Sequence, residues 1–292
     1  MERRFEKMEM EVCGSLLVVF LMGWYPPRSE LSVFDWKRGQ NIARLPDTDI
    51  ISSFRFLSDK VIVVATKGSL DLFTLPEPQD NTGEMLITKV ATLRLPFNGH
   101  SVEHISFCNP PAKNGNPRSK RQAGDTAVPT KPFANSPDNI IYCYVLVIDG
   151  EQFSSCSLVV HSSALLRYAT PPAFNYIPWK EWSMITRCVG ERVNYNYTNF
   201  SGQRWLLPRD NEVWDFNQYR VKRLGRDFEA ETETAHISVV TEQSCTASIY
   251  LDVYSSLPYV RIKSKREGLL CIDDDRIFAA TPDGKIEYLY FG

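Results

Sequence analysis

Side chains of the types that most enzymes use are sparse in this sequence of 292 residues. Histidine, the side chain best suited to proton transfer near neutral pH, occurs only at His100, His104, His161 and His236. No G-x-S-x-G segment marks a nucleophilic serine, and no glycine-rich loop of the G-x-G-x-x-G or G-x-x-x-x-G-K-[ST] kind marks a phosphate site. The sequence therefore predicts a protein without catalytic residues.

Two arrangements of side chains invite comparison with metal sites. His100 and His104 have the H-x-x-x-H spacing that can bind zinc on a helix, but the segment reads as a turn that enters a strand, and no third ligand is indicated. Calcium loops place ligands at alternate positions around a glycine bend, which the acidic run 273–275 lacks. This run separates the apolar runs 269–272 and 277–280, so we expect a hairpin turn. We expect no metal and no cofactor.

The cysteines are odd in number, widely spaced and never in a C-x-x-C pair, unlike those of a disulfide framework or a zinc finger. They are Cys13, Cys108, Cys143, Cys156, Cys188, Cys245 and Cys271. Cys143 and Cys156 flank an expected hairpin and could form a bridge. The favoured interpretation is buried free thiols in a reducing compartment, so we expect a cytoplasmic or nuclear protein.

Charge and hydropathy exclude two classes of partner. The net charge of −2 predicts no long-range attraction to nucleic acid or to an anionic membrane. The apolar run 12–25 is shorter than the roughly 20 residues of a membrane span, and the acidic residues before it are unlike those of a signal peptide. We expect a buried strand there. The basic run 263–266 could contact phosphate, but without a wider basic excess a solvated strand end is expected.

The elements that would hold any site are short strands. Runs of four to eight apolar, β-branched or aromatic residues alternate with polar turns along most of the chain. Residues 51–56 (ISSFRF) and 102–107 (VEHISF) align, each after an apolar segment rich in leucine. Residues 33–39, 70–75 and 213–216 read as copies of the last strand of a repeated unit. A four-strand unit every 40 to 50 residues or so is the period of a β-propeller. We therefore predict an all-β, degenerate WD-type β-propeller, with residues 1–292 as a single propeller-like domain.

One segment interrupts this pattern. Residues 109–139 lack periodicity and are dominated by Pro, Asn, Gly and basic residues, so we expect a disordered loop inserted in the domain. Its R-S-K-R run at 118–121 could act as a localisation signal or a contact patch, or could simply be solvated.

Residues 177–183 (IPWKEWS) predict a short helical turn, since proline suits a first helical turn. Trp179 and Trp182 are spaced i and i+3, and so lie on one face of that turn. This pair is our candidate for a partner-binding surface, because paired aromatics are common at binding hot spots. The alternative is that the pair packs a loop onto the core.

Several short segments, in the same order throughout, resemble the C-terminal propeller region of a large, expanded family of fungal F-box proteins. These segments are LLVVF (16–20), LSVFDWKRG (31–39), SFRFL (53–57), VATLRLP (90–96), IPWKEW (177–182), VWDF (213–216), LPY (257–259) and IDDDRI (272–277). The resemblance covers almost the whole chain. It implies a propeller of about six to seven four-stranded blades that recognises clients for a cullin–RING ubiquitin ligase. The sequence departs from the family because no F-box is visible in it. About one blade of the expected ring would also lie upstream of the first residue.

The leading hypothesis is a non-catalytic protein-binding module, the client-recognition part of such a receptor. Its client is unknown, and contact with the ligase adaptor would require an F-box upstream. The alternatives are a propeller enzyme or glycan-binding propeller, which would need a secreted chain with the sequons at Asn196 and Asn199 in use. A truncated, non-functional paralogue is the third hypothesis, and it predicts insoluble or molten protein.

Overall fold

The computed structural model describes thirteen stretches of the chain: residues 7–24, 27–45, 51–76, 85–97, 101–107, 139–149, 152–170, 174–190, 199–247, 252–265, 268–272, 276–281 and 283–290. Within them the chain is all-β, as predicted. Strands form six separate sheets, and nearly all neighbouring strands are antiparallel. The predicted loop 109–139 lies outside the described residues except for Asn139, and so does the acidic run 273–275.

The first three sheets are each built on four strands that follow one another in the sequence and pair in that order. The first contains β1 (Lys7–Cys13), β2 (Leu16–Trp24), β3 (Pro27–Asp35) and β4 (Gln40–Leu45), with β8 (Met85–Leu86) added in parallel. The second contains β5 (Ile51–Phe56), β6 (Val61–Thr66), β7 (Ser69–Thr74) and β9 (Thr88–Arg94), with β13 (Asn175–Ile177) added in parallel. The third contains β10 (Ser101–Phe107), β11 (Ile140–Asp149), β12 (Gln152–His161) and β14 (Thr186–Gly190).

The C-terminal half departs from this simple order. The fourth sheet runs β15 (Phe200–Ser201), β16 (Arg204–Leu207), β17 (Glu212–Asp215), β22 (Tyr259–Ser264), β19 (Ala235–Val240) and β18 (Glu229–Glu231). A small hairpin pairs β20 (Ser244–Ala247) with β21 (Asp252–Ser255). The last sheet contains β23 (Leu269–Ile272), β24 (Arg276–Ala280) and β25 (Ile286–Tyr290). β23 and β24 form the expected hairpin.

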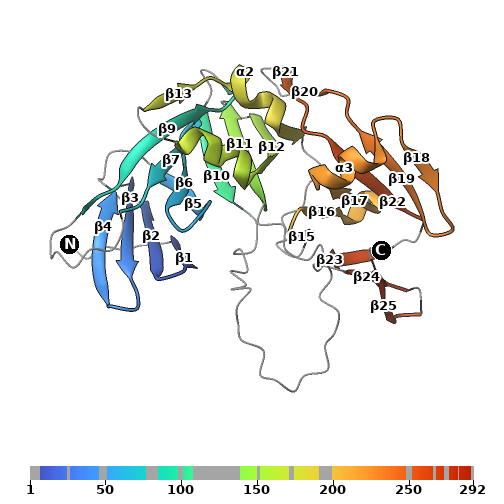
Figure 1. Ribbon diagram of the computed structural model, residues 1–292, viewed down its shortest axis with the longest axis horizontal. Coiled ribbons are helices and arrows are strands. Elements are labelled where there is room, and N and C mark those ends of the chain that lie inside the picture. The colour runs from blue at the N-terminus through green and yellow to red at the C-terminus, as the bar shows by residue number, and fades with distance from the viewer. Residues whose placement is uncertain are drawn as a thin grey trace.

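The sheets lie side by side along an arc, with the first sheet at one end and the last sheet at the other (Figure 1). The described strands do not close this arc into a ring. Short helices lie beside the sheets: α1 (Ser162–Leu166), α2 (Trp179–Trp182) and α3 (Gln218–Leu224). None of the described helices is both long and apolar enough to cross a membrane.

Neighbouring sheets pack face to face, and the alternation of side chains along each strand supplies both interfaces. On β6, Val63 and Ala65 face the core shared with the third sheet, whereas Ile62 and Val64 face the core shared with the first sheet. Tyr142 of β11 likewise belongs to the core between the third and fourth sheets. Since successive residues of a strand point to opposite faces, a strand buried on both faces must be apolar at nearly every position.

The first sheet buries only one of its faces. Val18 and Phe20 of β2 pack towards the second sheet and are fully buried. Met8, Met10 and Val12 alternate with the inward-facing residues of β1 and are more than half exposed. No described element covers this second face.

Buried aspartates recur at the third strand of a sheet. Asp35 of β3 accepts hydrogen bonds from the backbone N–H groups of Lys37 and Arg38, and Asp215 of β17 accepts one from Asn217. These carboxylates hold the turn that follows each strand, as short polar side chains do in Asx turns. Three segments were expected to be the last strands of their units: 33–39, 70–75 and 213–216. In the structure they form third strands, because a further strand of the same sheet pairs with each one: β4 with β3, β9 with β7, and β22 with β17. The aligned segments 51–56 and 102–107 both form first strands, β5 and β10.

Other local expectations differ from the structure at turns. The apolar run 12–25 is not one strand, because Gly14, with φ +63°, makes a tight turn between β1 and β2. Residues 27–29 are paired in β3 opposite β2, although prolines are rare within strands. Helix α3 was not expected; it begins at the Asn217 cap, whose side chain accepts from the backbone N–H groups of Tyr219 and Arg220.

The one-sided burial of the first sheet predicts that substitutions on its two faces will change the free energy of unfolding by very different amounts. Phe20→Ala should lower the free energy of unfolding by about 3–5 kcal/mol, because it opens a cavity in a fully buried core. Met10→Ala, at a side chain 59% exposed, should change it by no more than about 0.5 kcal/mol. Urea unfolding followed by circular dichroism measures both. Equal losses in the two variants would contradict the face assignment.

Candidate functional site

The predicted pair Trp179 and Trp182 lies on the short helix α2, and the two rings meet edge to face with centroids 4.8 Å apart. Trp182 is 0% exposed, and its indole N–H donates to the carbonyl oxygen of Arg94 at 2.9 Å. Trp179 is half-buried and packs against the same core. In this structure Trp182 therefore offers no surface to a partner, and any contact by the pair falls to Trp179.

Two of the described histidines, His161 and His236, have side-chain partners within the chain. The ring of His161 is buried, with Nε2 2.9 Å from the carbonyl oxygen of Phe216. His236 pairs with Glu229 at the surface, 2.8 Å away. His104 lies on β10, the expected strand, and burial lowers its pKa. His100 lies outside the described residues. In the part of the chain that is described, no group of three or more His, Cys, Asp or Glu side chains could hold a metal ion.

The cysteines that are described carry free thiols, so Cys143 and Cys156 are not bridged. Cys143, Cys156 and Cys188 are buried as expected, whereas Cys13 and Cys271 are half-buried and Cys245 is exposed. The pKa of Cys156 is raised well above its usual value, because its thiol hydrogen-bonds to Cys188 and is buried. It is therefore a poor nucleophile.

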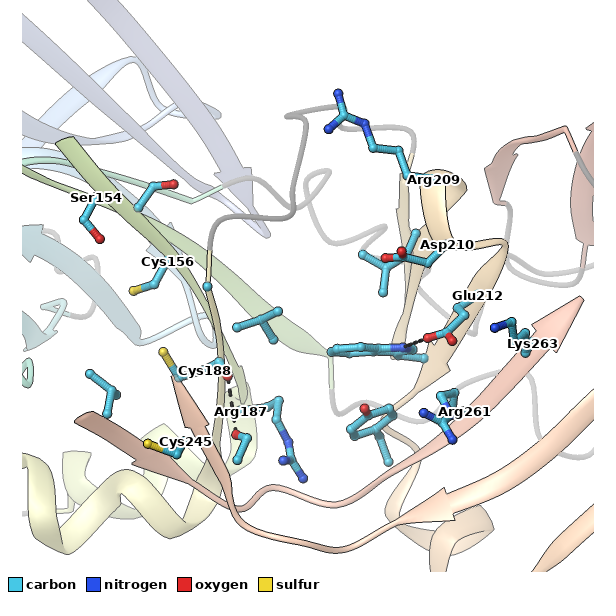
Figure 2. Close-up of a pocket in the computed structure, with 18 of the residues that line it drawn as sticks. Ser154, Cys156, Arg187, Cys188, Arg209, Asp210, Glu212, Cys245, Arg261 and Lys263 are labelled. Atoms are coloured by element: carbon cyan, nitrogen blue, oxygen red, sulfur yellow. Dashed lines mark hydrogen bonds between the residues drawn. The ribbon is translucent and has the colours of Figure 1, made fainter. Parts of the chain in front are cut away.

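A cavity of about 1290 Å³ opens between the third and fourth sheets, and its residues were not singled out as a group by the sequence. The third sheet and the β20–β21 hairpin supply one side of it, and β16, β17 and β22 supply the other (Figure 2). Arg187 and Cys188 lie on the first side in Figure 2, and Glu212, Arg261 and Lys263 lie across from them.

The wall from the fourth sheet is set by strand register. β17 and β22 are antiparallel, with Glu212 opposite Lys263 and Trp214 opposite Arg261. Directly opposed residues share one face of a sheet, so these four side chains form one surface. Tyr259 joins that surface two residues before Arg261. Period-2 alternation thus places charged and aromatic side chains towards the cavity, whereas Val213, Val260 and Ile262 face the core behind it.

Aromatic rings form the base of the cavity on the side of the fourth sheet. The rings of Trp214 and Tyr259 stack with centroids 4.4 Å apart and an interplanar angle of 28°. Trp214 is fixed further by its indole N–H, which donates to Glu212 Oε2 at 2.9 Å. The fully buried Phe216 packs on Tyr259, with a centroid distance of 5.4 Å. The floor is therefore a rigid, partly apolar surface.

Arg187 on β14 is the most buried charge in the cavity wall, at 3% exposed. Its Nε donates to the carbonyl oxygen of Leu257 at 2.9 Å, and its Nη1 donates to that of Glu242 at 3.0 Å. Its guanidinium lies over the ring of Tyr259, 5.1 Å from the centroid. Burial lowers the pKa of Arg187, yet arginine keeps its proton at any physiological pH.

Tyr259 cannot serve as an acid or base near neutral pH. Burial raises its pKa to about 12, and the nearby guanidinium groups of Arg187 and Arg261 offset only part of this effect. General acid–base catalysis needs a group that titrates near the working pH. At neutral pH Tyr259 therefore stays protonated and contributes a stacking ring to the cavity.

The charges in the cavity wall are unequal. Arg187, Arg209, Arg261 and Lys263 are cations, and Asp210 and Glu212 are the acids, so the lining has an excess of two positive charges. The basic run 263–266 thus contributes Lys263 to this cavity, rather than serving only as a solvated strand end. Arg187 and Arg261 lie far apart in the sequence, and only the fold places both of them in the lining of one cavity.

The chain was compared with protein-family models and with curated proteins. No protein-family model matches the chain, and no curated protein matches it significantly.

The sequon at Asn199 bears on the glycan-binding alternative. Asn199 is 5% exposed, so its side chain has no room for a glycan in this fold. The sequon at Asn196 lies outside the described residues.

The positions of the two tryptophans on α2 predict unequal effects on stability. Trp182→Ala should cost about 3–5 kcal/mol of unfolding free energy, since it empties a buried site and leaves the Arg94 carbonyl without its donor. Trp179→Ala, at the half-buried position, should cost less. Thermal unfolding of both variants tests this. A Trp182→Ala variant as stable as wild type would contradict the burial of Trp182 and would indicate that the pair is exposed.

Proposed function

We propose that this chain is a non-catalytic protein-binding module, and that its sheets are blades of a degenerate WD-type β-propeller. The observation that carries the proposal is the succession of the first three sheets, each built on four strands in sequence order and packed face to face, which resembles the packing of blades in a propeller. Contact between the first strands β5 and β10 of neighbouring sheets supports it, since first strands of blades lie next to one another around a propeller axis.

The resemblance to the propeller region of the fungal F-box family extends this proposal. It supports a role in recognising protein clients for a cullin–RING ubiquitin ligase, with about six to seven blades in the complete ring. The adaptor would be bound by an F-box outside these 292 residues. The chemistry of the cavity fits recognition, because its lining combines the donors of three arginines and a lysine with a stacked pair of aromatic rings.

Affinity purification of the tagged protein from its own cells, with mass spectrometry of the bound proteins, tests the function. We expect the cullin–RING adaptor and scaffold in stoichiometric amount, together with a client whose recovery rises when the proteasome is inhibited. The tag alone, expressed in the same cells, serves as the control for non-specific capture.

Each component of the proposal can fail separately. Absence of the adaptor and scaffold would overturn the ligase role. Absence of any stable partner in material that folds cooperatively would overturn protein binding itself.

A further inference from the structure

The outer face of the first sheet is apolar across β1 and β2. Strand register places three pairs of apolar side chains directly opposite one another on this face: Met8 and Leu21, Met10 and Val19, and Val12 and Leu17. The three side chains from β1 are 60%, 59% and 51% exposed, and those from β2 are partly exposed. Together they form what we call the first-sheet face.

The last sheet also has one buried face and one exposed apolar face. Ile277 of β24 packs into the core shared with the fourth sheet. The alternate residues of this strand point the other way, with Phe278 opposite Tyr288 and Ala280 opposite Ile286. Ile286 is 67% exposed and Tyr288 is 56% exposed. These four outward side chains form what we call the last-sheet face.

Elsewhere in the described chain, apolar sheet faces are covered by other sheets. A core of buried side chains lies between the first and second sheets, and further cores lie between the second and third, the third and fourth, and the fourth and last. The first-sheet and last-sheet faces stand at the two ends of this series, at opposite ends of the arc (Figure 1). Contiguous apolar surface of this kind marks an interaction site.

We propose that copies of this chain associate head to tail, with the last-sheet face of one copy packed on the first-sheet face of the next. This contact continues the series of stacked sheets from one copy into the next, so it repeats a packing that the molecule already uses between its own sheets. It covers both exposed faces at once. Contact between two first-sheet faces would leave both last-sheet faces in water.

A head-to-tail contact has a consequence for the size of the assembly. Each copy uses a different face for each of its two neighbours, so association does not stop at two copies, and it gives a closed ring or an open chain. This inference goes beyond the proposed function and requires neither a client nor a ligase.

Sedimentation velocity of the purified full chain at increasing protein concentration tests the contact. We expect the sedimentation coefficient to rise with concentration beyond that of a dimer. A folded wild-type chain that stays monomeric at every concentration overturns the proposal.

Two variants place a carboxylate in one face each. Met10→Glu changes the first-sheet face and Ile286→Glu changes the last-sheet face, and each should weaken association at least about tenfold, because the contact would bury an unpaired charge. Both side chains are exposed in a single copy, so thermal unfolding followed by circular dichroism should resemble that of wild type. Met184→Glu is the matched control. Met184 is also 59% exposed but lies outside both faces, in η2 (Ser183–Ile185), and its change should leave association within about twofold.

An equimolar mixture of Met10→Glu and Ile286→Glu decides between head-to-tail and other contacts. The intact last-sheet face of the first variant can pack on the intact first-sheet face of the second, whereas the reverse contact would bring two carboxylates together. We therefore expect dimers with one copy of each variant, although each variant alone is monomeric. A mixture that stays monomeric, loss of association in only one of these two variants, or an equal loss in Met184→Glu overturns the head-to-tail contact. These results are independent of the purification experiment, which identifies partners other than this chain.

Discussion

Burial of both faces of the middle sheets is the constraint on which the rest of this structure depends. A strand such as β6 lies between β5 and β7 within its sheet and between two further sheets across its faces. Its sequence, VIVVAT, is accordingly apolar at almost every position, without the polar alternation of a one-sided strand. Removal of either neighbouring sheet would expose a full face of such residues, so no single sheet is a stable unit. The sheets must fold as a stack, and each interface depends on the next one.

The cavity follows from the same stacking. Between the third and fourth sheets, the core of Tyr142, Trp205 and Phe216 fills one part of the interface. Beside it, the lining residues of β17 and β22 change from apolar to charged, and the sheets enclose a cavity of about 1290 Å³ in place of further core. A guanidinium as buried as that of Arg187 costs free energy unless its donors are satisfied. Its bonds to the Leu257 and Glu242 carbonyl oxygens meet part of that need.

Much of the fold could be predicted from the sequence, because strands and turns are local signals. The alignment of residues 51–56 with 102–107 identified two strands with equivalent places in neighbouring sheets, and the turn of tryptophans at 179 and 182 was correctly expected. The split at Gly14 was missed since an apolar run conceals a two-residue turn. The cavity could not be predicted. Arg187 and Arg261 are 74 positions apart (261 − 187), and a lone arginine in a strand resembles a solvated residue until the pairing of β17 with β22 is known.

Native-state hydrogen exchange tests the stacking most directly. The amides of β6, which pair with β5 and β7 while both faces are buried, should exchange only through global unfolding, with the highest protection in the chain. The amides of β1, an edge strand with one exposed face, should exchange through local opening at lower free energy. Protection of β6 no greater than that of β1 would contradict a structure held together by sheets that cover one another on both faces.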